Sequence, residues 1–115
     1  MIDQDKIAAQ KLKLETNKVH IENMINNNVN DNQPNTVLTN ALATISLVLQ
    51  EEIDFLGRLV TVDEIPLRKF YLQVFLAQLK TRLEGQETAQ IDLQWLQRVI
   101  QEEICFLDDL IHNER

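Results

Sequence analysis

Two glutamates lie where an ionised side chain is costly, at the centre of an apolar helical stripe. Residues 50–56 read QEEIDFL and residues 101–107 read QEEICFL, which gives six identities in seven at an offset of 51. Glu52 and Glu103 are equivalent in the two segments, and apolar residues lie three, four and seven positions to either side of each. A buried carboxylate needs a cation, a hydrogen-bond donor or water beside it. We therefore expect each glutamate to have a specific partner.

Three kinds of partner fit this pattern. The first is a core ion pair, in which Arg68 bridges Glu52 and Glu103 through its guanidinium group. The second is a metal or small ligand in a helical bundle, and the third is a protein interface where an acidic residue fixes the register. Di-metal bundles need about four carboxylates with Glu-x-x-His pairs, and only Asp109 and His112 place an acid and an imidazole at that spacing. The pair and the interface are therefore favoured, and the two glutamates are weak metal candidates.

Other catalytic patterns are missing from the sequence. Nucleophilic catalysis needs an activated side chain with a base held nearby. Cys105 lies off the apolar stripe among acidic neighbours, which favours an inert thiol. Gly57 and Gly85 are the only glycines, so no glycine-rich loop exists to bind phosphate or a dinucleotide. We expect no enzymatic activity and no cofactor.

Helices are expected to position these residues, because the chain has only two Gly, two Pro and few alternating apolar runs. Residues 1–25 have a poor amphipathic pattern, which fits either a helix or an arm that orders against a second subunit, and we favour the helix. Residues 26–35 contain six Asn and predict a loop. Three more helices follow within residues 36–115. Their ends are marked by Thr36 or Thr39 before the first, Asp63 and Pro66 before the second, Gly85 after it, and Thr88 or Asp92 before the last, which runs to about His112.

The repeated segment suggests that a helical hairpin of about 50 residues was duplicated. Short connections make neighbouring helices antiparallel. The predicted fold is therefore all-α, an up-down antiparallel four-helix bundle, possibly of two duplicated hairpins, in a single domain over 1–115.

Charge and hydropathy limit the kinds of partner. The formal net charge is −7, and residues 84–115 hold eight acids and two bases. This acidic end would repel phosphate, so nucleic-acid binding is disfavoured. No apolar run approaches the ~20 residues that cross a bilayer, and the first residues lack the pattern of a secretory signal. We expect a cytoplasmic protein that does not bind membranes.

The remaining interpretation is a protein–protein interaction module that acts as an adaptor, regulator or inhibitor. Its acidic last helix would select a partner with a basic surface. The helix expected after Pro66 is apolar around most of its circumference, so we expect it to be buried on nearly all sides, either by the N-terminal segment or by a partner. This favours a homodimer or a docking surface. The candidate partner-binding residues are Trp95, Glu102, Asp108 and Asp109.

Overall fold

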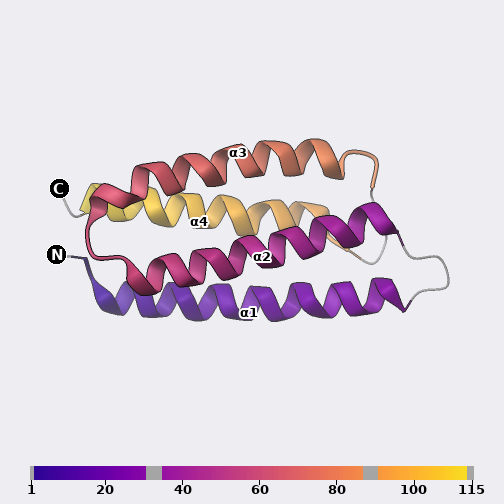
Figure 1. Ribbon diagram of the computed structural model, residues 1–115, viewed down its shortest axis with the longest axis horizontal. Coiled ribbons are helices and arrows are strands. Elements are labelled where there is room, and N and C mark those ends of the chain that lie inside the picture. The colour runs from indigo at the N-terminus through magenta and orange to yellow at the C-terminus, as the bar shows by residue number, and fades with distance from the viewer. Residues whose placement is uncertain (1, 31–34, 87–90, 114–115) are drawn as a thin grey trace. The chain divides into compact units, whose positions relative to one another are not determined.

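The computed structural model describes residues 2–30, 35–86 and 91–113, and they are helical almost throughout. The elements are α1 (Gln4–Val29), α2 (Thr36–Arg58), the short 3-10 helix η1 (Val62–Glu64), α3 (Ile65–Leu83) and α4 (Leu93–Asn113). Helix α1 packs on α2, and α3 packs on α4 (Figure 1). The prediction of an all-α, up-down arrangement of two hairpins is confirmed. No described helix has the length and apolar character needed to cross a bilayer.

The chain divides into two compact units, and each is described on its own. The first covers Asp3–Arg58 and contains the α1–α2 hairpin. The second covers Leu59–Arg115 with Met1–Ile2, and contains η1 and the α3–α4 hairpin. That residues 1–115 form a single domain stays a prediction.

Helix α1 contributes one narrow row of side chains to the first hairpin. Its buried residues recur every seven positions: Ile7, Leu14, Ile21 and Asn28. A single row of this kind gives a weak amphipathic pattern, although the segment is helical and packs on α2. Helix α2 buries a much broader arc, with ten residues from Leu38 to Leu56. Residues 1–25 were therefore correctly favoured as a helix.

The prediction of a loop over residues 26–35 was wrong for its first four residues, which belong to α1. Helix α1 continues to Val29, and Asn28 is 8% exposed. Its amide Nδ2 donates hydrogen bonds to the Asn35 carbonyl oxygen (3.1 Å) and to the Thr39 hydroxyl. Asn35, not a threonine, caps α2, because its side-chain oxygen accepts from the Leu38 backbone N–H at 3.0 Å. The bonds of Asn28 satisfy a side chain that could otherwise compete with helical structure.

The ends of α3 and α4 follow local signals with one exception. Gly85 has a φ of 77°, the left-handed conformation expected just after a helix. Asp92 caps α4 by accepting from the backbone N–H groups of Gln94 (3.0 Å) and Trp95 (3.1 Å). Asp63 was wrongly expected to cap α3, because it lies inside η1, which runs directly into α3. Thr88, the other start considered for α4, lies outside the described residues.

Candidate functional site

Both central glutamates are buried, as their apolar flanks predicted. The side chain of Glu52 in α2 is 0% exposed and that of Glu103 in α4 is 1% exposed. Along their helices, both lie among buried aliphatic side chains, with Val48 and Leu56 one turn away in α2, and Val99 and Leu107 in α4. Both residues take part in interactions, although Oε1 of Glu52 and Oε2 of Glu103 make no hydrogen bond among the described residues. Among the described residues, each unit therefore carries one buried glutamate among apolar side chains.

The two repeated segments also share their local geometry. The first and fifth residues of each segment are joined by a glutamine side chain: Gln50 Nε2 donates to Asp54 Oδ1 at 3.0 Å, and Gln101 Nε2 to Cys105 Sγ at 3.6 Å. The residues after each central glutamate, Ile53 and Ile104, are both buried. These parallels fit a duplicated hairpin, and the duplication stays a hypothesis.

Arg68 lies in the first turns of α3 and is half-buried. Its guanidinium carbon lies 4.7 Å from the centroid of the Tyr71 ring, one turn further along the helix. An arginine over an aromatic face keeps its planar edge available for carboxylates. The bridge from Arg68 to Glu52 and Glu103 stays a prediction.

The arrangement of potential metal ligands adds no support to the metal interpretation. Across residues 2–30, 35–86 and 91–113, no three His, Cys, Asp or Glu side chains lie close enough together to hold a metal ion. Cys105 is exposed on α4.

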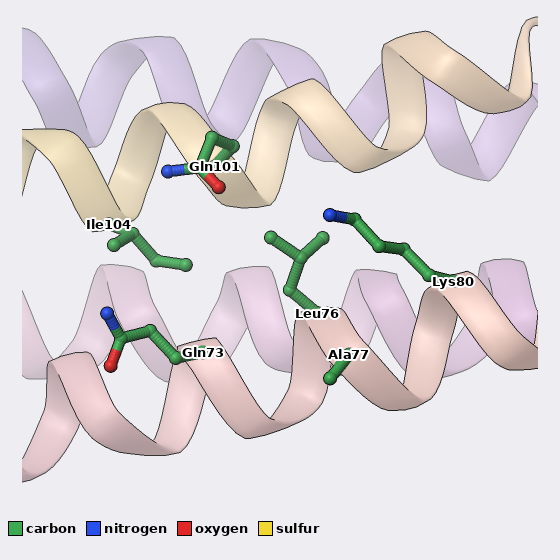
Figure 2. Close-up of a pocket in the computed structure, with 6 residues that line it drawn as sticks. All are labelled: Gln73, Leu76, Ala77, Lys80, Gln101 and Ile104. Atoms are coloured by element: carbon green, nitrogen blue, oxygen red, sulfur yellow. The ribbon is translucent and has the colours of Figure 1, made fainter.

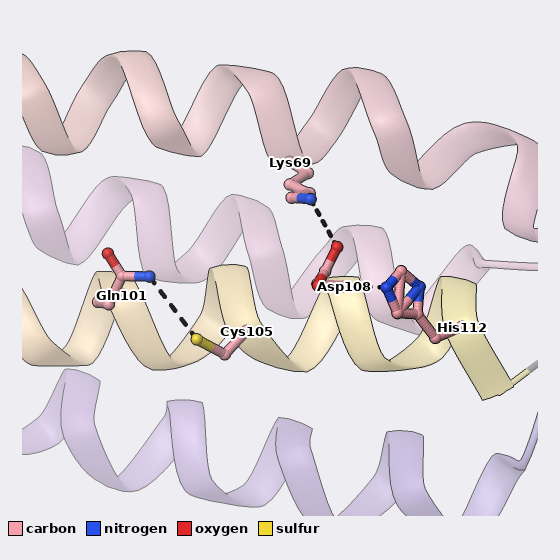
Figure 3. Close-up of polar contacts among 5 residues, drawn as sticks. All are labelled: Lys69, Gln101, Cys105, Asp108 and His112. Atoms are coloured by element: carbon pink, nitrogen blue, oxygen red, sulfur yellow. Dashed lines mark hydrogen bonds and ion pairs between the residues drawn. The ribbon is translucent and has the colours of Figure 1, made fainter.

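One of the acidic residues expected to contact a partner is already paired within its own hairpin. Lys69 Nζ of α3 lies 2.6 Å from Asp108 Oδ1 of α4, and His112 Nε2 lies 3.8 Å from Asp108 Oδ2 (Figure 3). The hydrogen bond from Lys69 is the main reason why the pKa of Asp108 is below its ordinary value. Asp108 thus helps to align α3 with α4, whereas Glu102 and Asp109 are exposed on α4. Trp95 is half-buried in the first turn of α4.

A groove separates α3 from α4 further along the same hairpin (Figure 2). Its volume is about 270 Å³, and it is partly open to solvent. Leu76, Ala77 and Ile104 form its apolar lining, and the side chains of Gln73, Lys80 and Gln101 complete it. The order in which α3 residues meet α4 residues, from Lys69–Asp108 to this groove, shows that the two helices are antiparallel.

The most exposed apolar surface of the second unit lies on α3, on the side opposite its buried arc. Leu67, Phe70, Tyr71 and Val74 are 77%, 62%, 42% and 41% exposed, and we call these four residues the α3 stripe. Their spacing of three, four and seven residues places them on one helical face. Within the described residues of the single chain nothing covers this face, so its burial by a partner stays a prediction.

Sequence reasoning expected a docking contact on this helix but did not single out the four residues of the α3 stripe. The signal was present as two apolar sets on opposite faces of one helix, since Leu72, Leu76 and Leu79 occupy the buried face. A wheel that is apolar on both sides does not indicate which side the chain itself covers.

Comparison of the chain with protein-family models, with curated proteins and with solved structures finds no match.

Proposed function

We propose that this protein is a non-catalytic protein–protein interaction module, an adaptor, regulator or inhibitor, that contacts other proteins through α3 and α4. The observation that carries the proposal is the α3 stripe. Contiguous exposed apolar side chains lower the solubility of a small protein, and such patches often mark a binding surface. Two large aromatic side chains, Phe70 and Tyr71, lie in the stripe, and aromatic residues are enriched at the energetic centres of interfaces.

The exposed acids of α4 give this module its selectivity. Glu102 and Asp109 are exposed on a helix whose surroundings in residues 84–115 carry eight acids and two bases. Charges at the rim of an interface steer association and reject partners of like charge. A partner with a basic surface is therefore preferred.

Capture from an extract of the source cells, followed by binding measurements with the purified partner, tests the proposal. The baits are the native chain, Phe70→Glu, and the double variant Glu102→Lys with Asp109→Lys. Leu47→Glu is the matched control, because Leu47 is an exposed apolar residue of α2 with 66% exposure. We expect the native chain and the control to bind the same basic protein, and the α4 double variant to bind it at least about tenfold more weakly. Binding should also weaken steeply as salt is raised.

The proposal is wrong if Phe70→Glu and the α4 double variant both bind partners as the native chain does. The second candidate is a bundle that holds a metal or small ligand, favoured by the burial of Glu52 and Glu103. Elemental analysis and the native mass of the purified protein separate the candidates. A stoichiometric metal or ligand that is lost in Glu52→Gln supports the second one.

A further inference from the structure

The apolar side chains of the α3 stripe can pack against the same side chains of a second copy. Phe70 and Val74 are one turn apart on the same face, with Leu67 and Tyr71 beside them. When two copies of such a helix meet face to face in opposite directions, Phe70 of each copy packs against Val74 of the other. A two-fold contact of this kind uses the same surface on both chains, as in most homodimers.

The charges beside the stripe are distributed unevenly along the chain. Helix α3 contains four basic residues and no acidic residue. Lys80 and Arg82 are exposed near its C-terminal end, whereas Asp63 and Glu64 are exposed in η1, directly before its N-terminal end. Within the described residues, none of these four side chains forms an ion pair.

This distribution decides between the two directions of self-pairing. With Phe70 against Val74 of the second copy, Asp63 and Glu64 come within about one helical turn of Arg82 of the second copy along the helix axis. Lys80 lies instead on the side of α3 that lines the groove with α4. The same attraction is repeated at the other end of the contact by symmetry. In a parallel pairing the acidic ends would meet each other and the basic ends would meet each other, which is repulsive.

We infer that the occupant of the α3 stripe is a second copy of this chain, held antiparallel by Asp63 and Glu64 against Arg82. The inference rests on the proposed function, because it names the protein that the stripe contacts. In this arrangement the dimer contact uses α3, and the basic partner would contact the exposed acids Glu102 and Asp109 on α4.

Sedimentation equilibrium of the native chain over a range of concentrations is the first experiment. We expect a dimer with twice the 13.4 kDa mass of one chain. Phe70→Glu should weaken the dimer at least about tenfold, and the control Leu47→Glu should not. Circular dichroism of each variant verifies that the helices are retained.

A charge exchange tests the direction of pairing. Reversing one end with Glu64→Lys should weaken the dimer at least about fivefold, and so should reversing the other with Arg82→Glu. The chain with both substitutions should recover the native dimer, because each reversed end again faces an opposite charge. Failure of this double variant to recover the native dimer contradicts antiparallel pairing.

The remaining outcomes distinguish this inference from the proposed function. A native chain that is monomeric at several hundred micromolar overturns the inference, as does a dimer that Phe70→Glu leaves intact. If a monomeric native chain captures a basic partner that Phe70→Glu loses, the stripe contacts that partner and only the inference fails. If the dimer forms as described but no partner depends on Glu102 and Asp109, the inference stands and the proposed selectivity fails. Binding of the monomer to anionic vesicles that is lost in Phe70→Glu would instead assign the stripe to a lipid surface.

Discussion

A carboxylate at the centre of an apolar arc destabilises the folded protein unless its charge is compensated. Glu52 and Glu103 are completely buried in their helices, and both take part in interactions. An ionised glutamate and a glutamine have nearly the same shape, so replacing one by the other removes the charge and changes little else. The neighbouring residues Glu51 and Glu102 are exposed, which gives each buried position a matched control one residue away.

If Glu103 is held as an ion by its partner, Glu103→Gln should lower the free energy of unfolding by about 2–3 kcal/mol, because the substitution removes that charge from the core. Glu102→Gln should change it by less than about 0.5 kcal/mol, as expected for an exposed site. Urea unfolding measures both values, and Glu52→Gln with Glu51→Gln repeats the comparison in the first hairpin. Equal stability of Glu103→Gln and the native chain would show that this carboxyl group is not held as an ion. A metal found by elemental analysis in the native chain but not in Glu52→Gln would assign the burial to a metal site.

At the scale of the helices, the two glycines have opposite roles. Gly57 lies near the end of α2, and a Cβ placed there would meet the Nζ atom of Lys11 at 3.4 Å, an ordinary contact with the tip of a flexible side chain. Gly85 has room for a side chain but adopts a φ of 77°, which residues with a Cβ rarely do. Space and conformation therefore predict different results for the same substitution.

Gly57→Ala should stabilise the protein by about 0.5–1 kcal/mol, since alanine loses less backbone entropy in a helix. Gly85→Ala should destabilise it by about 1 kcal/mol because of the strained backbone. Thermal unfolding followed by circular dichroism measures both. Destabilisation by Gly57→Ala would mean that the contact between Lys11 and α2 is tighter than the distance implies.

The helix ends show which local signals can be interpreted from sequence alone. Gly85 and Asp92 were identified because a left-handed glycine and an N-terminal aspartate act through their own backbone surroundings. The end of α1 was placed too early, because Asn28 is held by Asn35 and Thr39, residues beyond the loop. A composition typical of loops cannot predict a hydrogen bond that forms only after the chain has turned back.

For the whole chain, four helices in two hairpins could be predicted from composition, breakers and periodicity. The burial of both glutamates was also predictable, because apolar residues lie three, four and seven positions before and after each of them. The exposed stripe was not, since Leu67 and Val74 are as apolar as the buried leucines of α3 and only packing separates the two faces. Local patterns thus predict elements well, and they predict poorly which of two similar faces is covered.

The prediction that residues 1–115 fold as a single domain can be tested by destabilising one hairpin and measuring the unfolding of the other. Asn28→Ala removes a buried donor from the first unit and should cost about 1–2 kcal/mol, or roughly 5 °C in Tm. Trp95, the one tryptophan of the chain, reports on the second unit. In a single cooperative domain, Trp95 fluorescence and far-UV circular dichroism should show the same lowered Tm.

Asn27→Ala is the control for this experiment, because Asn27 is the exposed neighbour of Asn28. Separate transitions, with the Trp95 transition unmoved by Asn28→Ala, would show instead that the two hairpins unfold independently.

The exposed thiol on α4 gives the molecule a built-in spectroscopic ruler. Cys105 is the one cysteine of the chain and accepts a label without any engineering, and Trp95 lies ten residues earlier on the same helix. Ten residues of intact α-helix span about 15 Å, a separation suited to energy transfer from the indole to a short-range acceptor dye. The transfer efficiency therefore follows the integrity of α4 by itself, in the free chain and while it binds a partner.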